Sequence, residues 1–415
     1  MSEKRGVTVI GAGIVGLCCA RSLQRRGRVV TVIDPDEPGR GTSFGNAGLL
    51  STGSVFPEGH PGLWKQLPKL LLDPTGPLTI RPAYLPKMLP WLLRFLASTA
   101  PNRIEEISKA LASIILPSVQ DYLDLLDDIP RDQVPIRRQG CLYLYPTARD
   151  VLAAAPTNAA RRRRGVAVEI LGPNEVRQLV PAIRPDIAGG ALTTQSGHTT
   201  SPLALSNLLA AQIEREGGTF KRAKAIGFEI GAGGPTHVRT DHGNIAVDDV
   251  IIAAGAFSKP LAAALGNTVP LDTERGYHMM LPEPRIDVRV PMLIPSMGFA
   301  ITPMDDGLRI AGSVEFAGLK APPNFERSEI LLRHAKRLFP ELLETGKEPW
   351  MGYRPSMPDS LPVISRSNRF DRVFFAFGHG HLGLSLGAIT GRIITDLLID
   401  GSSNIDIAPF RADRF

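Results

Sequence analysis

Cysteine is scarce in this sequence, and its placement excludes several kinds of site. The 415 residues include three cysteines, Cys18, Cys19 and Cys141, and no Cys-x-x-Cys pair. A disulfide framework, a zinc site built on cysteine pairs and a redox-active dithiol are therefore excluded. The eight histidines show no metal-ligand spacing. We expect a protein without a metal that works in a reducing compartment, the cytoplasm.

Long uninterrupted apolar runs are also missing. No window reaches the roughly eighteen apolar residues that a membrane-spanning helix requires, and glycines interrupt the first apolar stretch too early for a signal peptide. The net charge is only +6, from 47 basic and 41 acidic residues, and no nucleic-acid-binding module accompanies it. We therefore expect no export, no membrane span and no nucleic-acid partner. The charge weakly favours an anionic substrate or an acidic membrane surface.

A strand–helix–strand unit opens the chain. The runs VTVI (7–10) and VVTVI (29–33) are typical of short buried strands, and a helical segment from about Ile14 to Arg26 lies between them. At 415 residues the chain is long enough for two domains. The opening unit predicts that one of them binds a nucleotide.

The turn before the first helix contains the motif Gly-x-Gly-x-x-Gly. Gly11 permits the tight turn, Gly13 the close approach of a pyrophosphate and Gly16 the close packing of the helix, whose N-terminus attracts phosphate. Asp34 ends the second strand, where a carboxylate can accept hydrogen bonds from ribose hydroxyls. These features predict a dinucleotide, either NAD or FAD. The expected pyrophosphate contacts are Gly11, Ala12, Gly13, Ile14, Val15 and Gly16.

Three later features favour FAD over NAD. The glycine-rich loop 39–48 stands where a nicotinamide dehydrogenase usually continues with regular elements, and its small residues let backbone amides reach a flat ring. A buried strand ends in Ala254 and Gly255, which are small enough to pass beside a dinucleotide. A glycine-rich turn near the end of the chain, which we call the closing turn, precedes the last helix. The N-terminus of that helix could face the flavin edge that becomes negative on reduction. The residues of the closing turn are Gly378, His379, Gly380, His381 and Gly383.

Two segments carry a family resemblance. The loop GTSFGNAG (41–48) and the segment GYRPSMPDSLPVI (352–364) resemble the Asn-Ala-Gly loop and the G-x-R-P-x-x-P-D-x-x-P-x-I motif of the D-amino-acid dehydrogenase and glycine oxidase group of FAD-dependent oxidoreductases. The resemblance extends from the first strand to the last helix and implies FAD as the cofactor. It implies cofactor contacts from Ser43, Asn46, Ala47 and Gly48, and a backbone contact from Ala225 to the adenine.

The same resemblance implies three substrate-site residues. The family's carboxylate anchor corresponds to Arg354, whose planar guanidinium can grip an α-carboxylate with two parallel hydrogen bonds. Tyr277 would help to hold the carboxylate, and His278 would contact the substrate or influence its amine. Either of these two side chains could instead pack within the sheet.

The reaction that the resemblance implies is oxidation of a D-amino acid by hydride transfer from Cα to flavin N5, which gives an imine and then a 2-oxo acid. The segments 41–51, 71–96 and 274–278 look closest to the D-hydroxyproline or D-proline dehydrogenase branch, so cis-4-hydroxy-D-proline and D-proline are candidate substrates. A quinone or an electron-transfer protein would reoxidise the flavin. Two alternatives stay open, a glycine or sarcosine oxidase that uses oxygen and a non-catalytic FAD-binding subunit.

The expected fold class is α/β, with a Rossmann-like FAD-binding domain and an inserted α+β substrate domain made of a mixed antiparallel sheet and helices. We assign residues 1–50, 196–266 and 351–415 to the FAD-binding domain. Residues 51–195 and 267–350 form the substrate domain.

Several segments outside the motifs also yield expectations. Residues 62–98 read as short helices, and the basic part 81–95 either packs over the substrate cavity or lies on the inner face of the membrane. Residues 104–128 look helical, and a strand pair is expected in 219–251. We expect the arginines at 161–164 to be solvated at a helix end. His60 and His198 read as exposed loop histidines.

Overall fold

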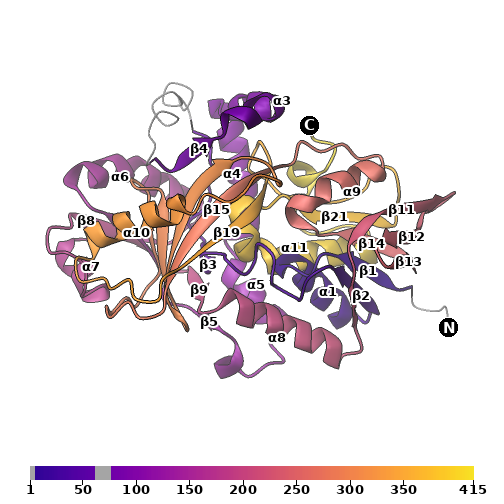
Figure 1. Cartoon of the computed structure of the whole chain (residues 1–415), viewed down its shortest axis with the longest axis horizontal. Helices are drawn as coiled ribbons and strands as arrows, with labels where there is room; N and C mark the ends of the chain where they lie inside the picture. The colour runs from indigo at the N-terminus through magenta and orange to yellow at the C-terminus, as the bar shows by residue number, and fades with distance from the viewer. Residues whose placement is uncertain (1–4, 61–75) are drawn as a thin grey trace.

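The computed structural model describes residues 5–60 and 76–415. Figure 1 shows two regions of strands along the long axis, with the sheet that contains the first strand on the right and a larger sheet on the left. Residues 61–75, which include part of the predicted helical segment 62–98, lie outside the described residues. The chain passes between the two regions several times, so each is built from separate stretches of sequence.

Six described strands form the sheet on the right. They are β1 (Val7–Ile10), β2 (Val30–Asp34), β10 (Thr219–Arg222), β14 (Asp249–Ile252), β20 (Val363–Arg366) and β21 (Val373–Phe377). The order is β10-β2-β1-β14-β21-β20, and every neighbouring pair is parallel except β20 with β21. β1 is buried along its whole length, as expected of a parallel strand covered on both faces.

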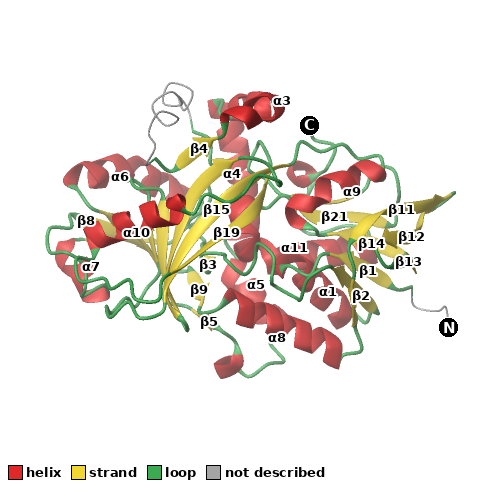
Figure 2. Cartoon of the chain, in the orientation of Figure 1, coloured by secondary structure: helices red, strands yellow, loops and turns green. Residues whose placement is uncertain are grey.

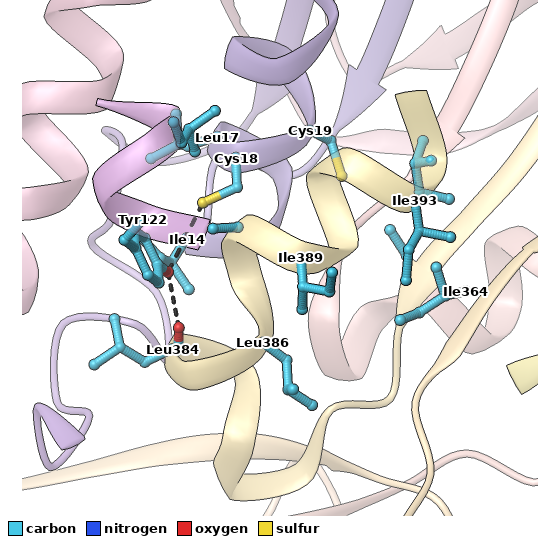
Figure 3. Close-up of a cluster of buried hydrophobic side chains, with 14 of the residues drawn as sticks. Ile14, Leu17, Cys18, Cys19, Tyr122, Ile364, Leu384, Leu386, Ile389 and Ile393 are labelled. Atoms are coloured by element: carbon cyan, nitrogen blue, oxygen red, sulfur yellow. Dashed lines mark hydrogen bonds between the residues drawn. The ribbon is translucent and has the colours of Figure 1, made fainter. Parts of the chain in front are cut away.

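Helices cover one face of this sheet (Figure 2). They are α1 (Ile14–Arg25), α4 (Pro101–Ile115), α5 (Ser118–Leu125), α8 (Pro202–Arg215) and α11 (Gly383–Ile399). Figure 3 shows part of their shared apolar core. There Tyr122 donates to the Leu384 carbonyl at 2.8 Å and receives a 3.8 Å contact from the Cys18 thiol, so one hydroxyl ties α5 to both α1 and α11. This core places the N-termini of α1 and α11 close to the ends of the sheet strands.

The opposite face carries a small antiparallel sheet and one helix. These are β11 (Ala225–Gly231), β12 (Gly234–Thr240), β13 (Gly243–Ala246) and α9 (Ser258–Ala264), which share a second core with the six-stranded sheet. The prediction of a single strand pair in 219–251 was wrong. Glycines with positive φ, Gly234 at 121° and Gly243 at 110°, permit tight hairpins that divide the segment into more strands.

The larger sheet has nine strands within the described residues. They are β4 (Leu78–Ile80), β6 (Cys141–Tyr145), β7 (Val168–Leu171), β8 (Gly189–Thr193), β15 (Asp272–Leu281), β16 (Met292–Ile294), β17 (Phe299–Met304), β18 (Gly307–Phe316) and β19 (Glu348–Ser356). The order is β19-β15-β18-β17-β16-β6-β8-β7, with β4 beside β18, and only the pairs β16 with β6 and β18 with β4 are parallel.

Four further helices pack around the larger sheet. They are α3 (Leu85–Ser98), α6 (Ala148–Arg163), α7 (Pro173–Leu179) and α10 (Glu326–Leu338). α10 crosses in front of the sheet in Figure 2 and contributes to its core. In α3, Met88 and Trp91 pack against Phe316. The 3₁₀ turns are η1 (Pro82–Tyr84), η2 (Arg131–Gln133), η3 (Gly255–Phe257), η4 (Gly380–Leu382) and η5 (Ala408–Phe410).

A third small sheet fastens the loop that follows β2. Its strands are β3 (Leu49–Leu50), β5 (Ile136–Arg137) and β9 (Gly197–Thr199), in the order β3-β9-β5. The Thr199 amide also donates to the Gly48 carbonyl at 2.8 Å. The residues that follow the predicted Asn-Ala-Gly loop are therefore fixed by strand pairing with β9.

The predicted fold class, an α/β domain with an inserted α+β domain, is confirmed. The domain boundaries remain a prediction, and β19, which belongs to the larger sheet, extends across the boundary at residue 351. The helical stretch 104–128 consists of two helices, α4 and α5, because Pro117 lies between them and lacks the amide that would continue the first.

Among the described residues, one helical stretch is long and apolar enough to cross a membrane by length and composition. It is Gly380–Ile399, with a mean hydropathy of 1.5, and 72% of its most apolar window is buried inside the protein. It contains α11, whose side chains pack against α1 and α5 in Figure 3. Its apolar character therefore reflects its place in the core.

Replacing Gly391 tests the close packing of α1 on α11. A Cβ at this position would lie 2.5 Å from the Cys18 carbonyl oxygen, a backbone atom that cannot rotate away. We expect Gly391→Ala to lower the free energy of unfolding by about 1–3 kcal/mol, although alanine favours helix. Chemical denaturation measures this. Gly6→Ala is the control, since its Cβ would meet only Asp248 at 3.8 Å, and equal stability of the two variants would contradict the packing.

Candidate functional site

A cavity of about 520 Å³ lies between the larger sheet and the segment 42–58, which we call the flavin loop. The strands β15 to β19 form one wall, and the flavin loop together with η4 and the start of α11 forms the other. Its size is typical of a small-molecule site. The cavity is lined mainly by apolar groups and contains the charged side chains Glu58, Arg161 and Arg354, with His381 beside them.

The glycine turn before α1 has the geometry that the motif predicts. Gly11 has φ 116°, and any Cβ there would collide with the Ala253 carbonyl. A Cβ at Gly16 would collide with the Gly11 carbonyl. Gly13, the residue before the helix, has no side chain to cap it, and the first turn contains no acidic residue. The N-terminus of α1 is therefore open to an anionic group.

Two side chains brace this turn. Asp34 accepts a hydrogen bond from the Ala12 amide at 2.7 Å on one carboxylate oxygen and from the Asp36 amide at 2.9 Å on the other. Burial raises the pKa of Asp34 above its ordinary value. Ser43 accepts a hydrogen bond from the Ile14 amide at 2.9 Å. The flavin loop thus starts at the helix N-terminus, as expected if Ser43 lies near the pyrophosphate.

A buried arginine holds the Asn-Ala-Gly part of the flavin loop. Arg309, on β18, donates from one nitrogen to the Phe44 carbonyl at 3.0 Å and to the Asn46 carbonyl at 2.7 Å. Burial lowers its pKa to about 10, so it stays charged at neutral pH. The Asn46 side chain accepts from the Gly48 amide at 2.9 Å, and Gly48 has φ 76°. Asn46 and Ala47 line the cavity, and the hydrogen bond from Arg309 to the Asn46 carbonyl fixes their position.

His278 supports the same loop, and of the two alternatives, contact with the substrate and packing within the sheet, the structure shows the second. The side chain is 2% exposed, and its Nδ1 donates to the Gly45 carbonyl at 3.0 Å. Its ring stacks on Trp350 with centroids 5.1 Å apart. Burial, and then the charge of Arg309, lower its pKa to about 3, so it is neutral in the working range. His278 positions the loop behind the cavity.

Tyr277 also packs within the sheet, the second of its two alternatives. Its hydroxyl donates to Glu315 at 2.6 Å and accepts from the Asn324 amide at 3.0 Å. The side chain is 1% exposed, and burial raises its pKa to about 12. Tyr277 contributes to the cavity wall. Its hydroxyl hydrogen is already donated to Glu315, so the hydroxyl is not placed to donate to a substrate carboxylate.

Arg354 reaches into the cavity from β19. Its two terminal nitrogens donate to the carbonyls of Ser313 and Gly312 on β18, at 3.2 and 3.3 Å. The side chain crosses Gly276 of β15, where any Cβ would collide with the guanidinium. These hydrogen bonds are long for charged donors. Arg354 is the sequence-predicted substrate residue that the structure places in the cavity with its charge available.

The closing turn divides its residues between two environments. Gly380, with φ 55°, and His381 line the cavity, and a Cβ at Gly380 would meet no atom within 4 Å. His379 points away from it, because its side chain is 3% exposed with Nε2 3.0 Å from the Thr390 hydroxyl. Burial lowers the pKa of His379 to about 3. Gly378, with φ 82°, makes the turn, and Gly383 begins α11.

The remaining cofactor predictions concern two strand ends. Ala254 and Gly255 follow β14, and Gly255 has φ 53° with open space where a Cβ would stand. The open space at Gly255 lies next to the end of β14. That end contacts the turn Gly11 to Gly16, because Ala253 packs against Gly16. Ala225 is the first residue of β11 and pairs with Thr240. Its contact with adenine remains a prediction.

Sequence reasoning misjudged two polar residues and missed two others. Arg161 is 8% exposed and lines the cavity, because its face of α6 turns inward and its Nε donates to the Gly53 carbonyl at 3.0 Å. His198 is 1% exposed in β9. Glu58 and its buried neighbour Glu274 were missed, since no motif marks them. A signal existed for Glu58, which follows the Asn-Ala-Gly loop in the same glycine-rich stretch.

These residues fit FAD. The open N-terminus of α1 suits a pyrophosphate, and the cavity between the flavin loop and η4 suits a flat ring system. The positive-φ glycines Gly255 and Gly380 have open space beside their backbone, which allows a close approach.

Comparisons with known proteins agree with this geometry. Residues 6–397 match the family model described as "DAO: FAD dependent oxidoreductase". The chain belongs to this family. It is therefore an FAD-dependent oxidoreductase, as the sequence predicts.

The relatives of this flavoenzyme match it over its whole length. It is 39% identical over 422 residues to a protein of Bradyrhizobium diazoefficiens named D-amino-acid oxidase, covering 100% of both chains. It is 30% identical over 423 residues to one of Rhizobium rhizogenes named D-amino acid dehydrogenase, covering 99% of each. Its fold resembles glycine oxidase from Geobacillus kaustophilus with a TM-score of 0.75 and 21% identity, covering 99% of both chains.

Arg309 offers a test of how the flavin loop is held. We expect Arg309→Met to weaken FAD binding by at least about tenfold, because two loop carbonyls lose a charged donor. Fluorescence titration of FAD into the apoprotein measures the affinity. Arg333→Met, at an exposed position on α10, is the control. An FAD affinity of the Arg309→Met variant within about twofold of the wild type would mean that FAD binding does not depend on the hydrogen bonds from Arg309 to the loop.

Proposed function

We propose that this flavoenzyme oxidises the Cα–N bond of a D-amino acid to an imine, which water hydrolyses to a 2-oxo acid. The observation that carries the proposal is Arg354, an arginine in the cavity whose hydrogen bonds to the protein go only to carbonyl groups among the described residues. The names of the relatives, D-amino-acid oxidase and D-amino acid dehydrogenase, support the same reaction class and stereochemistry.

Arg354 binds the α-carboxylate of the substrate. A planar guanidinium matches a carboxylate with two parallel hydrogen bonds, and such bonds are shorter and stronger than those that Arg354 now makes to Gly312 and Ser313. Binding would therefore draw the side chain toward the substrate at little cost. The fixed carboxylate sets the direction in which Cα faces.

The other residues of the site orient the reactants and exclude water. FAD, when bound, accepts the hydride that leaves Cα. Phe299, Leu293 and Trp350 line the cavity with apolar surface, which keeps water from the reacting atoms. The flavin loop, held by Arg309 and His278, keeps the cofactor wall rigid. No side chain needs to remove the Cα proton, since hydrogen leaves as hydride.

Within this class we propose a small proline-type substrate, cis-4-hydroxy-D-proline or D-proline. The resemblance of the segments 41–51, 71–96 and 274–278 to that branch supports it. The cavity of about 520 Å³ must hold both the flavin ring and the substrate, which favours a small amino acid. A five-membered ring would stand against the apolar wall while its carboxylate faces Arg354.

The electron acceptor separates two versions of the proposal. We favour a dehydrogenase that passes electrons to a quinone or an electron-transfer protein. The 39% identical relative is named an oxidase, which favours the alternative of direct reaction with oxygen. Mixing the reduced protein with oxygen and with a quinone dye distinguishes them, because a dehydrogenase is reoxidised much faster by the dye.

Anaerobic flavin bleaching tests the proposed reaction. The purified protein is mixed without oxygen with D- and L-amino acids, including both hydroxyproline epimers and glycine, and the flavin absorbance is followed. We expect bleaching by D-amino acids and fastest bleaching by a proline-type one. If no amino acid bleaches the flavin, the protein is a non-catalytic flavoprotein or oxidises another class of substrate.

Two substitutions test the carboxylate site independently. Arg354→Ala removes the guanidinium, and Gly276→Ala places a methyl group where the guanidinium now lies. We expect each to raise KM by at least about tenfold while the protein retains FAD, because neither residue belongs to the flavin loop. Arg333→Ala, with its side chain 53% exposed, is the control. Unchanged KM in both variants would remove Arg354 from the substrate site.

A further inference from the structure

Glu58 is a charged residue of the cavity that the carboxylate site does not use. It ends the flavin loop, its side chain is 32% exposed, and it lines the same cavity as Arg354. The backbone amide of Glu58 donates a hydrogen bond to the Ser360 hydroxyl at 3.2 Å, which fixes the position of the chain at Glu58. In the part of the chain that the structure describes, Glu58 and Arg354 do not form an ion pair.

Three groups from three different elements act on Glu58. His381, on η4, donates from Nδ1 to the Glu58 carboxylate at 2.6 Å. Arg354 on β19 adds a positive charge, and Glu274 on β15 is a hydrogen-bonding neighbour. Burial raises the pKa of Glu58, but the hydrogen bond and charge of His381 and the charge of Arg354 outweigh it, so that its pKa lies below the ordinary value. Glu58 is therefore ionised at neutral pH.

Glu274 is the opposite case. It is 1% exposed, and one carboxylate oxygen accepts from the Ser356 hydroxyl at 2.5 Å. Its other oxygen is buried, and the carboxyl group lies within hydrogen-bonding reach of Glu58. Burial, and then the charge of Glu58, raise the pKa of Glu274 to about 8. At neutral pH Glu274 carries a proton, so the pair holds a single negative charge and that charge is on Glu58.

An α-amino acid has a negative and a positive end separated by one carbon atom. A cavity with a guanidinium and a carboxylate that face one space without pairing is complementary to such a zwitterion. We propose that Glu58 binds the α-amino group of the substrate while Arg354 holds its carboxylate, and that Glu58 accepts the ammonium proton before the Cα–H bond breaks. This inference rests on the proposed amino-acid oxidation.

The proton transfer prepares the nitrogen for oxidation. An N–H bond of the ammonium breaks, its electron pair stays on nitrogen, and an O–H bond forms on Glu58. The nitrogen lone pair then forms the C=N bond as the hydride leaves Cα for FAD, and the product is an iminium ion. The proton on Glu58 is then released to solvent, which its 32% exposed side chain can reach. Glu58 is then ionised for the next substrate.

The decisive variant is Glu58→Gln, which keeps the size and loses the charge. The amino acid that bleaches the wild-type flavin is used under anaerobic conditions from pH 6 to pH 10. We expect bleaching by the variant to be slower by at least about tenfold at pH 7 and to recover as the amine loses its own proton at high pH. Glu58→Asp, which keeps a carboxylate, should restore part of the rate at pH 7.

Ligand binding gives a readout that does not depend on turnover. Cyclopentanecarboxylate has the carboxylate of a proline-type substrate and no nitrogen, and its Kd is measured from the change in flavin absorbance. We expect Glu58→Gln to leave this Kd within about twofold of the wild type. A large loss would mean that Glu58 positions Arg354 and does not contact the amine, which overturns the proposal.

Two further variants complete the test. Glu274→Gln keeps a hydrogen where the proposal places one and should retain activity at neutral pH, whereas a loss equal to that of Glu58→Gln would put the accepting charge on Glu274. Glu326→Gln, at an exposed position on α10, is the unrelated control. A pH profile of Glu58→Gln parallel to the wild type overturns the proton transfer. Absence of bleaching in the wild type would instead overturn the proposed function.

Discussion

The hydrogen bonds that Arg309 donates to the flavin loop connect the two halves of this protein. The loop leaves the nucleotide-binding sheet after β2, and its carbonyls at Phe44 and Asn46 are held by an arginine on β18 of the other sheet. His278 on β15 holds the Gly45 carbonyl between them. Because the loop forms one wall of the cavity and the sheet forms the other, these contacts set the width of the space in which the flavin and substrate must meet.

The chemistry of the cavity follows from charges fixed on those two walls. Arg354 comes from the edge strand of the larger sheet, and Glu58 comes from the end of the flavin loop. A partly buried guanidinium and carboxylate in one cavity would normally pair, since an unpaired charge shielded from water is costly. Here each is held by other groups, Arg354 by carbonyls and Glu58 by His381. The two opposite charges therefore stand in one cavity without pairing with each other.

The sequence predicted what short motifs encode and missed what long-range packing decides. The turn Gly11 to Gly16 depends on backbone geometry within a few residues, and its geometry was confirmed. The directions of His278 and Tyr277 depend on partners far along the chain, Gly45 and Glu315. No spacing in the sequence shows that Glu58 and Glu274, 216 positions apart, are neighbours of which only Glu274 keeps its proton at neutral pH.

A crystal structure of the FAD-loaded protein with cyclopentanecarboxylate is the most direct test of the central claim, that Arg354 is the carboxylate site facing the flavin. The account predicts both terminal nitrogens of Arg354 within hydrogen-bond distance of the ligand, with the flavin ring against the loop that Arg309 holds. It also predicts Glu58 still bonded to His381. A ligand carboxylate bound at Arg161, with Arg354 still on Gly312 and Ser313, would contradict it.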